Sequence, residues 1–223
     1  MSDREFLAMS QPLAIDFRKT LLRFLSAVLF FSLTVGFFSW SMGNLEQRVG
    51  SVFPDPVLRH WHPISVSFQI FILTWGTVVI SVVTIARDLP RLTQLAVAYS
   101  VLELMRILAI WLMPLEPPPL MITLDDPIND NLIFDRTVTK DLFFSGHVSA
   151  IWLLSCYFGR LSRMVLRLAA FVVAALLLAQ HVHYSIDVAA APFFATLAYR
   201  AGILWTSYWD RKDGQADITS STV

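Results

Sequence analysis

Residues 64–86, ISVSFQIFILTWGTVVISVVTIA, decide which kind of protein this chain is. The stretch runs for 23 residues without a charged side chain, and an α-helix of that length crosses the hydrocarbon core of a bilayer, which is roughly 30 Å thick. Inside that core every backbone N–H and C=O group needs a partner within the protein, and a helix supplies those partners by itself. The stretch therefore predicts a transmembrane helix.

The composition of the whole chain agrees with a membrane location. Of the 223 residues, 56% are hydrophobic and 15% are charged, against about 25% charged in an ordinary globular chain, and the mean hydropathy is +0.60. Lys plus Arg and Asp plus Glu both number 17, so the formal net charge is zero and a basic nucleic-acid-binding chain is excluded. The single cysteine, Cys156, excludes a disulfide-rich secreted scaffold.

Six apolar stretches have the length of a membrane span, which predicts an all-α fold: a six-helix transmembrane bundle. The first stretch is too long for the core of a signal peptide and no small-residue cleavage site follows it, so we expect a retained helix. The membrane domain is expected over residues 20–210, after an N-terminal segment (1–19) and before a C-terminal tail (211–223). The expected helices cover residues 20–42, 64–86, 92–113, 141–158, 164–180 and 184–205.

The distribution of cations predicts the orientation of the bundle. Six crossings place both termini on one side of the membrane. That side holds twelve Lys and Arg residues, the opposite side holds Arg48, Arg59, Arg136 and Lys140, and Arg106 is left inside the membrane. Because loops rich in Lys and Arg stay in the cytoplasm, we expect both termini to be cytoplasmic.

All five histidines then fall toward the non-cytoplasmic face, although the topology is assigned without them. His60 and His62 lie in the first outer loop, His147 in the outer half of the fourth helix, and His181 and His183 in the turn between the fifth and sixth helices. This convergence indicates a functional site at the outer end of the bundle.

The longest connection, residues 114–140, lies on the same face and is rich in Pro and Asp. Proline restricts the backbone, so we expect an ordered loop, and long loops inside compact domains often serve functional sites. An extended connector over the end of the bundle is an equally good interpretation.

The segment KDLFFSGH, residues 140–147, opens the fourth expected helix. The start of a helix offers unpaired N–H groups and the positive end of the dipole, where anions bind. Ser145 adds a hydroxyl donor, and Gly146 lets a phosphate approach the backbone closely. His147 is expected about two turns below Asp141, roughly 9 Å deeper. The alternative is a contact between small helix residues beside a hydrogen-bonded core histidine.

The segment QHVHYSIDV, residues 180–188, opens the sixth expected helix. His183 and Asp187 are four residues apart, so they share one face of the helix. A carboxylate beside an imidazole selects its tautomer and leaves the other ring nitrogen free to act. The alternative is an ion pair that only anchors the helix.

Arg106 lies in the outer half of the third expected helix, one turn after Glu103. A structural ion pair between the two is the default interpretation, and binding of a phosphate by the guanidinium is the functional one. Ionisable groups inside a membrane are candidates for function. A histidine nucleophile oriented by a carboxylate, a second histidine as proton donor, and an arginine with helix N–H groups as anion clamp would suit phosphoryl transfer.

The element SGH at residues 145–147, followed by HYSID at residues 183–187, resembles the type 2 phosphatidic acid phosphatase superfamily, and most of all its sphingomyelin synthase-like branch. That branch carries an Asp six residues before the histidine of its Ser-Gly-His element, where this chain has Asp141. It also carries His-Tyr-Thr-x-Asp, matched here with Ser185 in place of Thr. Six helices with cytoplasmic termini and an outer active site agree with the resemblance.

The resemblance implies a mechanism. His183 would attack the phosphorus of a lipid head group and become a phosphohistidine, Asp187 would orient it, and His147 would protonate the departing alcohol. A second alcohol, or water, would then release the group. No metal or organic cofactor is implied. The residues expected to bind the substrate are Arg106, Lys140, Asp141, Ser145, Gly146 and Tyr184.

The chain also departs from the phosphatase branch of the superfamily. That branch has a Lys followed seven residues later by Arg-Pro, where this chain has Tyr99 and Ile107 around Arg106. It has an Arg six residues before the second histidine, where this chain has Leu177. Lys140 and Arg136 are candidates to replace these cations. The departures argue against a plain phosphatase and favour the synthase-like branch.

The sequence thus predicts a membrane phospholipid phosphotransferase that moves a phospho-head group to a lipid alcohol on the non-cytoplasmic side. We expect His147 and His183 to border a cavity that opens sideways to the bilayer. A lipid phosphate phosphatase and an inactive lipid-binding homologue are alternatives. A metal-binding transporter or sensor is a further alternative, and its ligands would be His60, His62, His147, His181, His183 and Asp187.

Overall fold

Helices dominate the part of the chain that the computed structural model describes, residues 17–133 and 137–220. Within these ranges there is no β-strand, which confirms the predicted all-α fold. A short 3-10 turn, η1 (Leu58–His60), and a π turn, η2 (Asn129–Ile133), lie in the loops. The main helices are α2 (Phe17–Leu45), α3 (Ser67–Ile85), α4 (Leu89–Leu112), α5 (Gly146–Ser155), α6 (Arg160–Ala179) and α7 (Ser185–Ser220).

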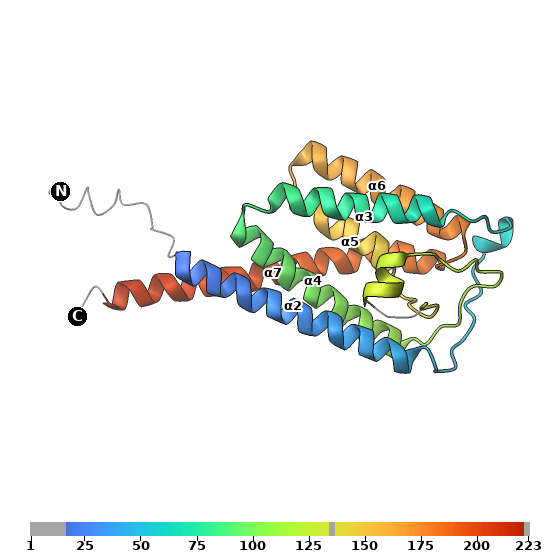
Figure 1. The fold of residues 1–223 in the computed structure, drawn as a ribbon, viewed down its shortest axis with the longest axis horizontal. Helices are drawn as coiled ribbons and strands as arrows, with labels where there is room; N and C mark the ends of the chain where they lie inside the picture. The colour runs from blue at the N-terminus through green and yellow to red at the C-terminus, as the bar shows by residue number, and fades with distance from the viewer. Residues whose placement is uncertain (1–16, 134–136, 221–223) are drawn as a thin grey trace.

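Five of these helices, α2, α3, α4, α6 and α7, are long and apolar enough to cross a membrane. The chain is therefore a multi-pass integral membrane protein. The first residues of α2 and the last turns of α7 lie at the same end of the bundle (Figure 1). Which side of the membrane this end faces stays a prediction.

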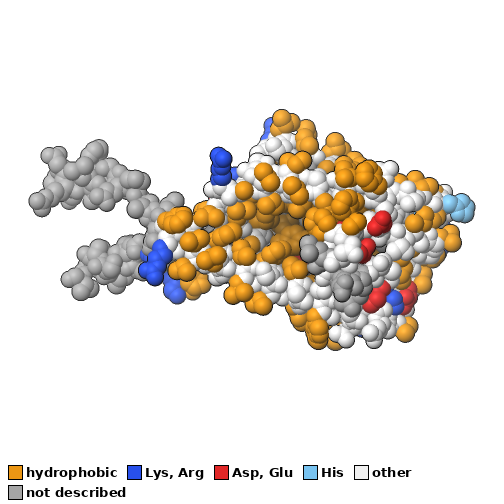
Figure 2. Space-filling model, in the orientation of Figure 1, with side chains coloured by type: hydrophobic (Ala, Val, Ile, Leu, Met, Phe, Trp, Pro, Cys, Tyr) orange, Lys and Arg blue, Asp and Glu red, His pale blue; other side chains and the backbone are white. Residues whose placement is uncertain are grey.

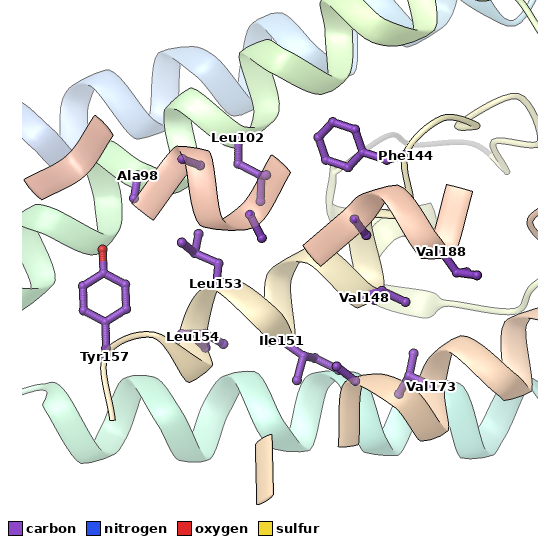
Figure 3. Packing of buried hydrophobic residues seen from close by; sticks show 14 of the residues in the cluster. Ala98, Leu102, Phe144, Val148, Ile151, Leu153, Leu154, Tyr157, Val173 and Val188 are labelled. Carbon is purple, nitrogen blue, oxygen red and sulfur yellow. The ribbon is translucent and has the colours of Figure 1, made fainter. Parts of the chain in front are cut away.

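The short helix α5 forms the centre of the bundle. It packs against α3, α4, α6 and α7, and its side chains lie among those of its neighbours in Figure 3. Ile151 and Leu153 are completely buried, and Val148 and Leu154 are nearly so. A helix that is apolar on all sides is stable only when it is surrounded by protein or lipid. The ten residues of α5 are surrounded by longer helices, so this crossing can be shorter than one that faces lipid.

Helix α5 is shorter than the helix expected over residues 141–158. It begins only after Ser145, whose hydroxyl oxygen accepts a hydrogen bond from the Val148 N–H and caps the first turn. Asp141 therefore lies in the preceding loop. His147 lies in the first turn of α5, so the expected depth of two turns below Asp141 is wrong.

Helix α7 is longer than the helix expected over residues 184–205. It continues to Ser220, so the backbone is helical where we expected the C-terminal tail to begin. Gly202 allows α7 to pack closely against α4, since a Cβ atom there would lie 2.9 Å from the Gln94 carbonyl oxygen and 3.0 Å from the Ala98 side chain.

The surface of the bundle has the polarity of a membrane protein. Hydrophobic side chains cover the middle of the face in Figure 2, several Lys and Arg side chains lie toward the end where α2 begins, and acidic side chains lie toward the other end. Phe68, Leu161 and Phe193 are each more than 60% exposed. Such a band of large apolar side chains is stable against lipid and not against water.

The orientation can be tested with single cysteines in a Cys156→Ser background. Val49 is 90% exposed in the loop after α2, and Lys212 is exposed near the end of α7. We expect a membrane-impermeant maleimide to label Val49→Cys on intact cells and Lys212→Cys only after permeabilisation, because loops rich in Lys and Arg stay cytoplasmic. The opposite labelling pattern would reverse the orientation.

Candidate active site

A backbone hydrogen bond joins the two histidine motifs. The N–H of Ser145, just before α5, donates to the carbonyl oxygen of Asp187 in the first turn of α7 at 3.2 Å. Both residues are completely buried, so water does not compete for this bond. Segments more than thirty residues apart in the chain thus lie side by side.

His183 and Asp187 form the pair that their spacing predicts. The Nδ1 atom of His183 lies 3.3 Å from Oδ2 of Asp187, and the Tyr184 N–H donates to the same oxygen at 3.1 Å. The carboxylate lies in the first turn of α7, where the helix dipole favours negative charge. With Nδ1–H donating to the carboxylate, the lone pair of the His183 imidazole is on Nε2.

His147 has a carboxylate partner of its own. Its Nε2 atom lies 3.1 Å from Oδ2 of Asp126, and Asp126 also accepts hydrogen bonds from Trp75 Nε1 at 3.0 Å and Asn129 Nδ2 at 2.7 Å. Burial by itself would raise the pKa of Asp126, but the hydrogen bonds from His147, Trp75 and Asn129 outweigh it and hold this pKa below its usual value. Asp126 is therefore a carboxylate that stabilises positive charge on the His147 ring.

A cavity of about 50 Å³ is bordered by both His147 and His183, as the sequence predicts. Residues of the long loop form most of its wall. The turn before α7 and the start of α5 complete it. The lining residues are Met121, Thr123, Leu124, Asp126, Asn129, Asp130, Val138, Thr139, Asp141, His147, Val182 and His183.

Arg106 lies outside the wall of this cavity. It is 5% exposed, and its guanidinium makes a 2.9 Å ion pair with Glu103 and a second ion pair with Asp141. The Phe38 ring lies 4.7 Å from the guanidinium carbon. A charge buried between two carboxylates is stable where a lone charge is not. Arg106 thus connects α4 to the loop that carries Asp141, and Asp141 does line the cavity.

Gly146 makes room for Arg106. A Cβ atom at this position would lie 2.6 Å from the guanidinium carbon, so the guanidinium, which two ion pairs hold, would have to shift. The missing side chain therefore lets a guanidinium approach the start of α5, whereas the sequence suggested the approach of a phosphate.

Lys140 and Tyr184 are also absent from the wall of this cavity. Lys140 Nζ donates to a Glu116 carboxylate oxygen at 2.9 Å and to the Arg48 carbonyl at 2.7 Å. The Tyr184 hydroxyl donates to the Glu116 carbonyl at 2.9 Å. Hydrogen bonds from the Gly50 N–H and from Lys140 lower the pKa of Glu116. Arg136, the other candidate cation, lies outside the described residues.

Asp126 was not predicted from the sequence as the partner of His147. The one signal was its place in an acidic, proline-rich loop. Asp126, Asp130 and Asp141 give the cavity three carboxylates, and none of the described lining residues is Lys or Arg. Leu177, at the place where the phosphatase branch has an Arg, is completely buried in the apolar core.

The structure does not bring the five histidines together. His147 and His183 border the cavity described above, whereas His60, His62 and His181 border a second cavity. Within residues 17–133 and 137–220 no group of three or more His, Cys, Asp or Glu side chains is arranged to hold a metal ion. The histidines that the metal-binding alternative needs as ligands are therefore divided between two cavities.

The fold and site define a membrane-embedded helical protein with a pair of carboxylate-bound histidines. The profile of the family described as PAP2 superfamily C-terminal matches residues 140–203, which contain both histidine motifs. This segment belongs to the type 2 phosphatidic acid phosphatase superfamily, as predicted, while the sphingomyelin synthase-like branch stays a prediction. Members of this superfamily are generally phosphatases or phosphotransferases, which supports an enzymatic activity on lipid phosphate esters. No curated protein matches the chain.

Replacing Gly146 by Ala tests the contact between Arg106 and α5. The added Cβ overlaps the buried guanidinium, so we expect the free energy of unfolding to fall by about 1–3 kcal/mol. Thermal unfolding in detergent, followed by circular dichroism, measures the change. Gly76→Ala in α3 is the matched control, because a Cβ there meets no atom within 4 Å. Equal melting temperatures for the two variants would contradict the role of Gly146.

Proposed function

We propose that this protein is a membrane phospholipid phosphotransferase that moves a phospho-head group through a phosphohistidine intermediate to an alcohol acceptor. The observation that carries the proposal is the cavity bordered by His147 and His183, each hydrogen-bonded to a buried carboxylate. Paired histidines with these partners are suited to nucleophilic attack and to general acid–base catalysis.

In the first half-reaction Nε2 of His183 attacks the phosphorus of the lipid. The N–P bond forms while the bond from phosphorus to the oxygen of the lipid alcohol breaks. Asp187 holds the Nδ1 proton of His183, which keeps the attacking lone pair on Nε2. His147, whose Nε2 is bound to Asp126, donates the proton on its Nδ1 atom to the departing oxygen.

In the second half-reaction the hydroxyl of the acceptor attacks the phosphohistidine. His147 takes the hydroxyl proton, a new O–P bond forms, and the N–P bond breaks to restore His183. With water as the acceptor, the same steps would make the protein a phosphatase. A phosphotransferase differs from a phosphatase in that it binds a lipid alcohol as the acceptor. A two-tailed lipid substrate would enter the site sideways from the outer leaflet.

Arg106 acts in this proposal as a positioning residue. Its ion pairs with Glu103 and Asp141, together with its packing against Gly146, hold the loop before α5 and the first turn of α5 in place. The positive end of the α5 dipole at His147, which borders the cavity, would then favour the phosphate.

The charge of the cavity wall supports a head group with a positive end. Asp126, Asp130 and Asp141 line the cavity without Lys or Arg among its described residues. Burial, followed by the proximity of Asp126, raises the pKa of Asp130. Since an anionic head group would be repelled by these carboxylates, we favour a zwitterionic phospholipid that carries an amine.

His183→Ala tests the nucleophile. We expect turnover of a phospholipid labelled with ³²P in its head group to fall at least 10³-fold, because no other group can form the intermediate. Separation of the labelled products identifies the reaction. A new labelled phospholipid indicates transfer, and labelled phosphate or phosphobase indicates hydrolysis. Alkaline trapping of [³²P]phosphohistidine from the wild type, and not from His183→Ala, is expected. Equal turnover by wild type and His183→Ala would reject His183 as the nucleophile, and turnover no higher than background in both would leave an inactive lipid-binding homologue.

Asp126→Asn tests the carboxylate that pairs with His147. The amide cannot stabilise positive charge on His147, so we expect kcat to fall by about 10–100-fold with little change in KM. The matched control is Asp125→Asn, which changes the exposed neighbouring carboxylate outside the cavity. An equal effect of both substitutions would assign the loss to loop charge and not to the Asp126–His147 pair.

A further inference from the structure

A second and larger cavity, of about 460 Å³, lies beside the proposed active site. The turn before α7 separates the two: the side chains of Val182 and His183 border the smaller cavity, and those of His181 and Tyr184 border the larger. The catalytic proposal gives the larger cavity no role. Its lining residues are Val52, Phe53, Pro54, Asp55, Leu58, Arg59, His60, Trp61, His62, Pro119, Leu120, His181 and Tyr184.

His181 is held in this wall with an unused nitrogen. The residue is 3% exposed, and its Nδ1 lies 3.1 Å from the Pro119 carbonyl oxygen. A carbonyl only accepts, so Nδ1 carries a proton and the neutral ring keeps its lone pair on Nε2. That Nε2 atom is buried and has no hydrogen-bond partner within the described residues. A buried polar atom of this kind needs a partner that the described residues do not supply.

The turn that ends α6 fixes the position of His181. Its φ angle is 58°, in the left-handed region that often follows the last residue of a helix. The N–H groups of His181 and Val182 donate to the carbonyl oxygens of Leu178 at 3.1 Å and Leu177 at 3.0 Å, and these two bonds cap the C-terminus of α6. The Trp61 ring packs against the imidazole edge to face, with centroids 6.4 Å apart.

The remaining polar groups of the wall favour an anion. Arg59 is exposed and makes no ion pair or hydrogen bond with another described residue, and His60 and His62 lie beside it in the chain. Asp55 is the one carboxylate among the described lining residues, and both of its oxygens already accept hydrogen bonds from the backbone. It accepts hydrogen bonds from the N–H groups of Val57 at 2.8 Å and Ser185 at 2.6 Å.

We infer that the larger cavity binds a phosphate monoester group, with Arg59 and His181 as its principal contacts. The guanidinium fork of Arg59 matches phosphate oxygens. A phosphate monoester has a pKa near neutral pH, as free imidazole does. A single proton can therefore form the hydrogen bond between Nε2 of His181 and a phosphate oxygen, whether the ring or the phosphate carries that proton. A sulfate has no proton to share with the neutral ring. The inference does not depend on the proposed catalytic function.

The experiment uses the full chain carrying His183→Ala, so that the smaller cavity lacks its nucleophile. Inorganic phosphate is titrated into this protein in detergent at pH 7.5, and binding is followed by calorimetry and by NMR of ¹⁵N-labelled histidine. We expect saturable binding that shifts the His181 ring resonances, with sulfate at least tenfold weaker. Absence of binding, or equal affinity for sulfate, would overturn the inference.

Two further substitutions in the same background locate the site. His181→Asn keeps a residue that tolerates the left-handed backbone and removes the imidazole, and Arg59→Gln removes an exposed charge. Each is expected to weaken phosphate binding at least tenfold. Arg160→Gln, an exposed residue at the start of α6 outside both cavities, is the matched control and is expected to change nothing. Unaltered affinity in both His181→Asn and Arg59→Gln contradicts the inference.

Competition identifies the source of the phosphate group. Displacement of phosphate by glycerol 3-phosphate, and not by micelles of short-chain phosphatidic acid, indicates a soluble ligand, and the reverse result indicates a lipid head group. Both results support a monoester site. Failure of both competitors to displace phosphate would reject it.

Discussion

The hydrogen bond between the Ser145 N–H and the Asp187 carbonyl oxygen, 3.2 Å long, is the contact on which the site depends. It holds the loop before α5 against the first turn of α7. Because it is buried, breaking it would leave two polar groups without water or protein partners. This contact brings His147 and His183 near each other, because His147 lies two residues from Ser145 and His183 lies four residues from Asp187.

Charged side chains in the interior of the bundle are held in ion pairs. A lone charge is costly inside a membrane, and the ionisable groups at the centre of the site are paired. Arg106 pairs with Glu103 and Asp141, and the imidazoles of His147 and His183 each pair with a carboxylate. The carboxylates therefore hold the side chains that the proposed chemistry needs, and Gly146 removes the one Cβ that would push Arg106 away.

The turn between α6 and α7 borders two cavities. His183 faces the cavity shared with His147, and His181 faces the larger cavity on the other side. A histidine pair spaced by one residue is thus divided between two cavities.

The sequence by itself determined the helices and the His183–Asp187 pair, because both depend on local regularities: apolar length for a membrane span and a spacing of four residues along a helix. The sequence did not predict that Asp126 pairs with His147 or that α5 begins only after Ser145. Both features depend on contacts between segments that are distant in the chain. Only the tertiary structure placed Arg106 against Gly146 and separated the histidines into two cavities, because side chains far apart in the chain meet through packing that no local pattern encodes.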